Sequence, residues 1–499
     1  MIENGDKIKI EDFVTVSKRY LETLGIAALR AYGRNVGVSR ATAKKKNEII
    51  ADIIAIFCGE LAPIERSKRG APIRDDTFDP KIAETMNAFR FAHLLHVESA
   101  LPLDTQKEGL DWGIALKEGK KRPFVLEVND TQEGMQGEKR KLHVGQLETL
   151  NKVSLLLPLD CVDSQEKVVI SVEYIHEFNL REGDVISCYA QQSRGVYVAN
   201  KIVKINGIDA EAFSRSRFDM MDVCYPFERL QVYEPNRFSK IEHKFTQWLT
   251  PLGKGQRGLI ISSPKAGKTQ YLYSLAQAVK GLNPTVETYV LLVDQAPETV
   301  SAFRKLVGDD NLLYTTYDDD PDRQIFVADF LMKRAKCQVE SGKDVVVFVD
   351  SFNALARAYN DTDESAGGKT FANGLESKTI HYIKKYLGSA RQTEKKGSLT
   401  ILGSVTVGTG NPADEMIATE LSTVANLEIR LSDALAYKRV FPALDVALVH
   451  CKQEENLRTK EETLLNQELR KNYLSEHSAE ELLSVLEHAQ TIDDVLTKI

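Results

Sequence analysis

The sequence contains the segment Gly258-Leu-Ile-Ile-Ser-Ser-Pro-Lys-Ala-Gly-Lys-Thr269, an apolar, strand-like run followed by a turn of small residues that ends in Lys-Thr. Residues 270–279 then have the composition of a helix. A turn between a strand and a helix supplies backbone N–H donors, a helix N-terminus and a lysine, which together bind phosphate. We therefore predict a nucleotide phosphate loop in which Lys268 neutralises the β- and γ-phosphates and Thr269 binds magnesium, although Ser262 replaces the usual first glycine.

A second segment, Asp344-Val-Val-Val-Phe-Val-Asp350, is an apolar strand that ends in a carboxylate. The carboxyl ends of parallel strands share one edge of a sheet, and phosphate loops lie at that edge. We therefore expect Asp350 to lie beside the phosphate loop and to hold the magnesium shell. Many strands end in Asp, so the segment is informative only together with the phosphate loop.

From Gly253 onward, strand-like segments alternate with helical ones. Strands are expected at 258–261, 289–293, 345–349, 399–405 and 426–431. This alternation predicts a parallel α/β sheet covered by helices. We assign residues 234–499 to this domain and expect charged, leucine-punctuated helices at its C-terminal end.

Residues 143–233 have a different pattern, of short strands separated by turn residues. Strands are expected at 168–172, 184–188, 195–199 and 201–205. This spacing predicts a small β-barrel or sandwich. An N-terminal helical domain is expected over residues 1–61, followed by a variable insert over residues 62–142 in which we find no chemistry. The fold class is therefore multidomain α+β.

The N-terminal helical domain carries a basic cluster, which is open to two interpretations. It comprises Arg30, Arg34, Arg40, Lys44, Lys45 and Lys46. One interpretation is a solvated helix face, and the other is a contact with nucleic acid.

The composition limits the class of protein. The chain has 499 residues, of which 72 are acidic and 65 basic, a net charge of −7, and 42% hydrophobic and 27% charged residues. Such a chain exceeds one compact core, and it is not collagen-like, disulfide-stapled or wholly disordered. Its slight acidity argues against binding nucleic acid through bulk positive charge, but not against a local basic groove.

The sequence gives no indication of a membrane or an oxidising compartment. No apolar run approaches the roughly 18 residues that span a bilayer, and the acidic N-terminus does not resemble a signal peptide. The six cysteines are scattered without a CxxC pair, so we expect reduced thiols in a cytoplasmic protein. We expect no zinc site, because His93 and His96 fit one helix flank better than half a metal site.

Several segments together closely resemble the family of the bacterial transcription termination factor Rho. They are Gly255-Gln-Arg-Gly-Leu-Ile260, Pro264-Lys-Ala-Gly-Lys-Thr269, Asp350-Ser351, Leu355-Ala-Arg-Ala-Tyr-Asn360, Gly397-Ser-Leu-Thr-Ile401 and Lys438-Arg-Val-Phe-Pro-Ala443. The resemblance extends in order from about Gly145 to Ile499, and residues 175–184 are similar to the RNA-binding OB-fold of that family. The N-terminal helical domain resembles the family's N-terminal helical region, whereas the insert has no match.

The resemblance implies a ring-shaped, hexameric, RNA-dependent ATPase with an OB-like β-barrel and a RecA-like P-loop motor domain. ATP and Mg²⁺ are the implied cofactors, and single-stranded RNA and RNA polymerase are the implied partners. ATP would be held by Pro264, Lys265, Ala266, Gly267, Lys268, Thr269, Gln270 and Phe441, the last stacking on adenine. Thr269 and Asp350 would bind the metal, and Arg439 would reach phosphate at the subunit interface. The RNA contacts would be Tyr197, Lys369, Thr409 and Gly410.

Two catalytic positions depart from the family pattern. Gln295 stands where the family has its water-activating glutamate, and a glutamine can orient water but cannot accept a proton. Glu298 lies close in sequence, and we expect it to substitute in part. Lys452 stands where the family has an arginine finger, so the charge is kept but the planar, bidentate fork is lost.

Two RNA-binding positions also depart from it. Pro412 replaces a lysine of the second pore loop, and residues 152–158 contain none of the aromatic side chains that the family has there. Base stacking on aromatic side chains is worth roughly 1–3 kcal/mol per base. Tyr197 does align with a retained aromatic residue, and the alternative is an ordinary strand tyrosine that packs on a neighbour.

Three hypotheses follow. The first is an ATP-dependent, RNA-translocating termination factor with weakened hydrolysis. The second is a catalytically impaired paralogue that binds ATP and RNA, or joins the rings of an active relative, as a regulator. The third is another RecA-like hexameric ATPase, acting on DNA or serving transport, which shares the motor domain but not the OB-like segment.

Overall fold

The computed structural model describes residues 43–57, 125–126, 142–150, 153–161, 168–193, 196–362, 374–394, 397–469 and 479–498, together with isolated positions between 21 and 38. Residues 1–111 and 112–499 form two separate compact units. In the first unit, helix α3 (Lys46–Phe57) lies within the N-terminal helical domain expected over residues 1–61. Ile49, Ile50 and Ile53 lie buried on one face of it, as their helical spacing predicts.

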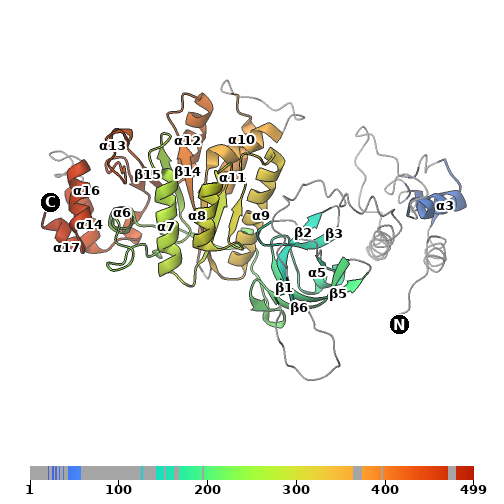
Figure 1. Ribbon diagram of the computed structural model, residues 1–499. Helices are drawn as coiled ribbons and strands as arrows, with labels where there is room; N and C mark the ends of the chain where they lie inside the picture. The colour runs from blue at the N-terminus through green and yellow to red at the C-terminus, as the bar shows by residue number, and fades with distance from the viewer. Residues whose placement is uncertain are drawn as a thin grey trace. The chain divides into compact units, whose positions relative to one another are not determined.

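The second unit begins with a β-barrel (Figure 1). Its strands are β1 (Val125–Leu126), β2 (Leu142–Leu150), β3 (Val153–Leu157), β4 (Val168–Val169), β5 (Val185–Ser193), β6 (Val196–Ile205) and β7 (Ile208–Asp209). The pairing β2-β3-β4-β6-β5 closes on itself because β5 also pairs with β2. The β4–β6 pair is parallel, and the other pairs of this ring are antiparallel. A short helix, α5 (Val172–Glu177), connects β4 to β5.

Two expectations for the barrel differ from the structure. The strands expected at 195–199 and 201–205 are one strand, β6, and residues 172–177 are helical. The two longest strands before residue 168, β2 and β3, were missed by the sequence pattern. β2 buries His143, Gln146 and Glu148 next to apolar neighbours, so its sequence does not alternate cleanly between apolar and polar.

The motor domain is built on a nine-stranded sheet. Its strands are β8 (Val223–Cys224), β9 (Arg257–Ser262), β10 (Glu287–Leu292), β11 (Leu312–Tyr314), β12 (Asp344–Asp350), β13 (Arg391–Thr393), β14 (Ser398–Thr406), β15 (Leu427–Arg430) and β16 (His450–Cys451). The central order is β11-β10-β12-β14-β9-β15, and all of these pairs are parallel. All five strands expected from the sequence are therefore present, and their carboxyl ends meet at one edge of the sheet.

Helices cover both faces of this sheet (Figure 1). One apolar core lies between the sheet and α6 (Ile241–Trp248), α7 (Lys268–Leu282), α8 (Pro297–Val307), α14 (Lys460–Glu468) and α16 (Ala479–His488). The other core includes α9 (Pro321–Glu340), α10 (Phe352–Thr362), α11 (Ser377–Gly388) and α12 (Pro412–Val424). The strand residues alternate between the two cores: Ile260 and Phe348 enter the first, whereas Ile261 and Val349 enter the second. The remaining elements are α13 (Asp433–Tyr437), α17 (Ile492–Leu496) and the short 3-10 turns at 210–212, 218–220 and 454–456.

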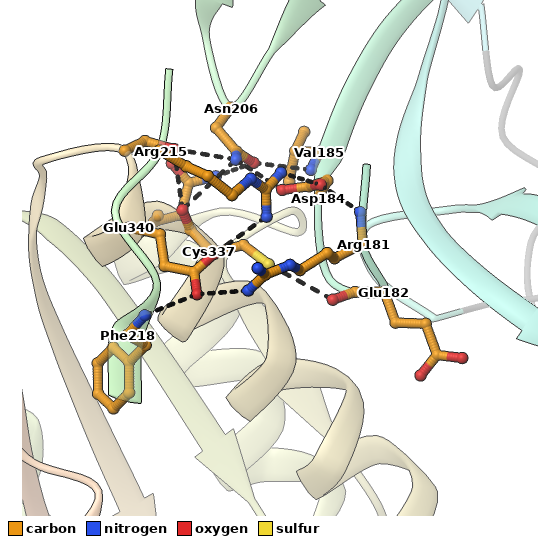
Figure 2. Close-up of polar contacts among 11 residues, drawn as sticks. Arg181, Glu182, Asp184, Val185, Asn206, Arg215, Phe218, Cys337 and Glu340 are labelled. Atoms are coloured by element: carbon orange, nitrogen blue, oxygen red, sulfur yellow. Dashed lines mark hydrogen bonds and ion pairs between the residues drawn. The ribbon is translucent and has the colours of Figure 1, made fainter. Parts of the chain in front are cut away.

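Helix α9 joins the barrel to the motor domain. The Arg334 side chain, 1% exposed, donates to Gln146 Oε1 of β2 at 2.7 Å and to the carbonyl oxygen of Leu159 at 2.6 Å. At the last residue of the helix, Glu340, a second contact forms: Arg215 lies between Asp184 and Glu340, with N–O distances of 2.5 and 3.0 Å (Figure 2). Buried charges are costly unless they are paired, so these contacts hold the barrel in one arrangement on α9.

The predicted domain boundaries at residues 61, 142 and 233 stay predictions. Within the part of the chain that the structure describes, no helix is both long and apolar enough to cross a membrane. The five described cysteines, Cys161, Cys188, Cys224, Cys337 and Cys451, form no disulfide.

Candidate nucleotide site

The predicted phosphate loop lies between the end of β9 at Ser262 and the start of α7 at Lys268. Its backbone turns through the left-handed region at Lys265 (φ 68°) and at Gly267 (φ 102°). Gly267 needs this freedom, because residues with a Cβ rarely adopt such a φ. Residues 264–267 thus lead directly into the first turn of α7, where unpaired backbone N–H groups bind anions.

Lys268 is the cation of this loop, and its side chain is almost fully buried. Its Nζ donates to the carbonyl oxygens of Ser262 at 3.2 Å and Ser263 at 2.9 Å, and to Ser262 Oγ at 3.2 Å. Burial lowers the pKa of Lys268 to about 8, although the carboxylates of Asp350 and Asp433 act in the opposite direction. A cation held by neutral oxygens is incompletely compensated, which favours an anionic ligand.

Thr269 and Asp350 lie together, as the sequence predicts. Thr269 Oγ1 donates to Asp350 Oδ2 at 2.6 Å, and Ser404 Oγ donates to Asp350 Oδ1 at 2.5 Å. Burial raises the pKa of the Asp350 carboxyl, while the two hydroxyl donors and Lys268 stabilise its charged form. A hydroxyl and a carboxylate are hard oxygen donors of the kind that Mg²⁺ prefers, so this pair fits a magnesium ion bound to nucleotide phosphates.

Gln295 lies just beyond β10, at the same edge of the sheet. Asp294 has a left-handed backbone (φ 56°), and the Gln295 backbone N donates to the carbonyl oxygen of Thr315 at 3.1 Å. Gln295 Nε2 donates to the carbonyl oxygen of Val293 at 3.4 Å. Glu298 lies in the first turn of α8 and is exposed. Neither side chain has a hydrogen bond to Lys268, Thr269 or Asp350.

Phe441, which follows α13 in the chain, lies beside Gly267 of the phosphate loop. A Cβ built on Gly267 would lie 3.8 Å from its ring, and 48% of the Phe441 side chain is exposed. A hydrogen bond from Ser263 Oγ to Asp433 connects the loop to α13, after which the chain continues to Phe441. A half-exposed ring next to a phosphate loop presents an apolar face that a nucleotide base can stack on.

Arg439 and Lys452, the other predicted catalytic cations, are both exposed. Arg439 has a left-handed backbone (φ 64°) and precedes Phe441 by two residues. The Lys452 backbone N donates to the carbonyl oxygen of Asn426, next to β15. Within the described ranges, neither side chain is hydrogen-bonded or ion-paired to Lys268, Thr269 or Asp350.

The predicted RNA contacts are separate from the nucleotide site. Thr409 Oγ1 donates to Asp414 Oδ2 at 2.7 Å, which ties the loop containing Gly410 to the first turn of α12. Pro412 is the first residue of that helix. Lys369 lies outside the described residues.

Tyr197, on β6, is partly buried against the barrel core. Its ring lies 5.0 Å from that of His143. Tyr197 therefore packs on neighbouring side chains, as expected for an ordinary strand tyrosine, the alternative to an RNA contact.

Two polar residues of the site were missed by sequence reasoning. Ser404 contacts the predicted metal-binding residue Asp350, and Asp433 contacts Ser263, which directly precedes the predicted ATP-binding residues. Ser404 lies near the carboxyl end of β14, which pairs with β12. The signal in the sequence was its position at the end of the expected strand 399–405, at the same sheet edge as Asp350. Asp433 follows β15 at the same sheet edge, directly after Ser432 at the start of α13. A Ser-Asp pair at a helix start is also typical of helix capping, so the sequence did not identify Asp433 as a site residue.

Comparison with known proteins places the chain among nucleotide-binding proteins. Residues 244–449 match the model of the ATP synthase alpha/beta family, nucleotide-binding domain. The chain is 35% identical over 343 residues to transcription termination factor Rho of Bacillus subtilis (strain 168), which covers 68% of this chain and 78% of that protein. It is 34% identical over 302 residues to the factor of the same name from Escherichia coli (strain K12), covering 60% and 72%.

The match to transcription termination factor Rho of Micrococcus luteus is 35% identical over 370 residues and covers 71% of this chain. It spans about half, 52%, of that longer protein. Among solved structures, an ATPase of a bacterial type III secretion system is similar with a TM-score of 0.45 at 21% identity, over 55% of this chain and 78% of that one.

Proposed function

The chain belongs to the transcription termination factor Rho family, and from this premise we propose that it is an ATP-dependent, RNA-binding transcription termination factor with weakened hydrolysis. In this proposal the chain forms a hexameric ring in the cytoplasm, translocates single-stranded RNA and acts on RNA polymerase. It belongs to a family of ATP-hydrolysing enzymes, so the proposal concerns its substrate, assembly and rate.

The observation that carries the proposal is the arrangement of Lys268, Thr269 and Asp350. The buried Lys268 lies at the start of α7. The hydroxyl of the next residue, Thr269, donates to the buried carboxylate of Asp350 at 2.6 Å. In this arrangement Lys268 would hold the nucleotide phosphates, and Thr269 with Asp350 would hold the Mg²⁺. The bound metal ion would supply charge neutralisation at the phosphates.

The weakened hydrolysis is proposed from the residues around that arrangement. Gln295 would orient the attacking water without accepting its proton, because a carboxamide is not a base. Lys452 would contribute charge from a neighbouring subunit without a bidentate fork. Arginine fingers typically contribute on the order of a thousandfold or more to rate, so the lysine should lose a large part of that.

The proposed RNA-binding role rests on the topology of the barrel. Five strands close in the order first-second-third-fifth-fourth, with α5 between the third and fourth strands. This strand order supports our proposal that the barrel is OB-like, a fold that binds single-stranded nucleic acid in many proteins. The aromatic-free segment at 152–158 predicts a weaker grip on bases than aromatic platforms give.

RNA-stimulated ATP hydrolysis by the purified full chain tests this function. We expect slow turnover that pyrimidine-rich RNA increases and DNA increases less. Lys268→Ala should remove it, and Lys280→Ala is the matched control, because Lys280 lies in the last turn of the same helix and donates to the carbonyl oxygen of Leu306. Turnover that RNA does not change, or that equals Lys268→Ala, would contradict the proposal.

A second candidate, a regulatory subunit that binds ATP without efficient hydrolysis, is favoured by the joint presence of Gln295 and Lys452. It predicts tight ATP binding together with turnover no greater than that of Lys268→Ala. Measuring binding and turnover on one preparation therefore separates the two candidates.

A further inference from the structure

Arg323 is a buried cation in the first turn of α9, and it contacts both the barrel and a loop at the carboxyl edge of the motor sheet. Its Nη2 donates to the carbonyl oxygen of Cys161 at 3.4 Å, and its Nε lies 3.3 Å from Asp319 Oδ1. Arg323 is only 8% exposed, so both contacts are shielded from water. We assigned it no role from the sequence, and it lies outside the arrangement of phosphate loop and metal ligands.

On the barrel side, Arg323 holds the turn at 158–161 that follows β3. Leu157 and Cys161, at the two ends of this turn, are buried in the motor-domain core that includes α9, and not in the core of the barrel. Arg334, further along α9, donates to a carbonyl oxygen of the same turn at 2.6 Å. Because such cores are close-packed, a displacement of this part of the barrel reaches its contacts on α9.

On the nucleotide side, Arg323 holds Asp319 in the loop after β11. Asp319 Oδ2 accepts hydrogen bonds from the Thr316 backbone N at 2.7 Å and from Thr316 Oγ1 at 3.2 Å. The preceding residue, Thr315, is fully buried, and its carbonyl oxygen accepts the backbone N–H of Gln295 at 3.1 Å. The backbone of Gln295 is therefore positioned by the loop that Asp319 and Arg323 hold.

The guanidinium of Arg323 is incompletely paired. Its two contacts, at 3.4 and 3.3 Å, are longer than the roughly 2.7–2.9 Å of a charge-assisted hydrogen bond. Within the part of the chain that the structure describes, Nη1 is buried without a hydrogen-bond partner, which costs free energy. A second arrangement of the turn and the loop, in which Nη1 gains a partner, would recover this cost. At the last residue of α9, by contrast, Arg215 contacts Asp184 and Glu340 at 2.5 and 3.0 Å (Figure 2).

We propose that Arg323 is a positioning residue that couples the barrel to Gln295. This role rests on the proposed function, in which the barrel binds RNA and Gln295 orients the attacking water. RNA bound to the barrel would favour one arrangement of the turn at 158–161, and Arg323 would then fix Asp319 and the loop that holds Gln295. Such coupling requires that RNA bind more tightly to one of the two arrangements. RNA should then raise the rate of hydrolysis and leave the affinity for ATP unchanged, because the coupled group is Gln295 and not the phosphate loop.

The test compares ATP turnover by the purified full chain with and without a saturating cytidine oligomer. In Arg323→Met, the increase in turnover that RNA gives should be smaller by on the order of fivefold or more, the lower end of typical couplings between two sites. Turnover without RNA, the affinity for the oligomer and the affinity for ATP should each stay within about twofold of the wild type, because the variant removes only the coupling.

Lys333→Gln is the matched control. Lys333 lies further along the same helix and pairs with Glu148 of the barrel at 2.7 Å, so this variant also removes an ion pair between α9 and the barrel. It is remote in sequence from the loop that holds Gln295, and it should keep the full increase in turnover with RNA.

Asp319→Asn tests the same route without removing the buried cation. The amide oxygen can still accept the hydrogen bonds from Thr316, but the ion pair with Arg323 is lost, so the increase with RNA should fall as it does in Arg323→Met. The double variant should lose no more than either single variant, because both remove one shared contact.

The contrary outcomes are distinguishable. Wild-type turnover that RNA does not change would sink the proposed function together with the coupling. Wild-type stimulation that persists in Arg323→Met and in Asp319→Asn would sink the coupling alone. Equal losses in Arg323→Met and Lys333→Gln would assign the effect to docking of the barrel in general. A loss of oligomer affinity in Arg323→Met would mean that this residue supports the barrel itself and does not act on Gln295.

Discussion

The two sides of the nucleotide site are held in different ways. Lys268, Thr269 and Asp350 are buried or hydrogen-bonded to one another within one chain, and Asp350 receives hydrogen bonds from two hydroxyls. Arg439 and Lys452 are exposed, and Phe441 is half exposed. Buried, mutually bonded groups are positioned before the ligand arrives, whereas exposed ones must be ordered by something else. The difference teaches that, under the proposed function, one chain would be sufficient for binding phosphate, while the groups proposed to complete hydrolysis would be ordered by a second surface.

The largest expected effect comes from removing the buried cation. Lys268→Ala should lower ATP affinity on the order of a hundredfold, because charge-assisted hydrogen bonds to phosphate contribute about 1.5–3 kcal/mol and no other buried cation of this loop replaces them. Titration calorimetry with ATP and Mg²⁺ measures this. Lys280→Ala, at the far end of α7, should bind ATP like the wild type. Equal losses in both variants would mean that the helix, and not the phosphate loop, was damaged.

A smaller effect is expected from the carboxylate on the same side. Mg²⁺ should increase the ATP affinity of the wild type, and this increase should be about tenfold smaller in Asp350→Asn. The reason is that an amide is a weaker ligand for Mg²⁺ than a carboxylate. The hydrogen bond from Thr269 can still form to the amide oxygen, so affinity for ATP measured in the presence of a metal chelator should change little. If both affinities fall together, Asp350 supports the loop and does not hold the metal.

Phe441 tests the exposed side. Phe441→Leu should weaken ATP binding by about fivefold, the lower end of the roughly 1–3 kcal/mol that stacking of a base on an aromatic ring contributes. Binding of inorganic triphosphate, which has no base, should not change. Tyr437→Leu is the matched control, because Tyr437 is 86% exposed and lies four residues earlier. A loss of triphosphate binding would contradict a base-stacking role.

The smallest effect is a dependence on pH. Burial lowers the pKa of Lys268 to about 8 in the free protein, and bound phosphate should restore the charged form. Above a pH of about 8, Lys268 is therefore mostly neutral in the free protein but charged in the complex. Binding of ATP takes up a proton in this pH range. ATP affinity should fall about twofold between pH 7 and pH 8 and further above it. Calorimetry in buffers with different ionisation enthalpies measures the proton uptake, and Lys268→Arg should remove the trend.

Much of the motor domain followed from sequence, because its central strands carry continuous apolar runs. Val345 to Val349 are buried on both faces of the sheet, and such a run cannot be mistaken for a surface strand. The phosphate loop was equally readable, since Gly267, Lys268 and Thr269 occupy a strand–turn–helix context that few other functions require.

The remainder was not readable, for physical reasons. Strand β11 has only three residues, Leu312 to Tyr314, which is too short for a period to appear. In the barrel, Gln146 is buried because it bonds to Arg334, 188 residues later, and no local pattern reports such a partner. The stacked Tyr359 and Tyr382 are 23 positions apart in sequence, and only the packing of α10 on α11 brings their rings together.

The central claim is that the binding side of the site is intact while the hydrolytic side is altered. The most direct test is RNA-stimulated turnover of the double variant Gln295→Glu/Lys452→Arg against the wild type. We predict that turnover rises at least tenfold, since a proton acceptor and a bidentate fork return, while the ATP dissociation constant stays within about twofold. Wild-type turnover equal to that of the double variant, at the same ATP affinity, would contradict the account.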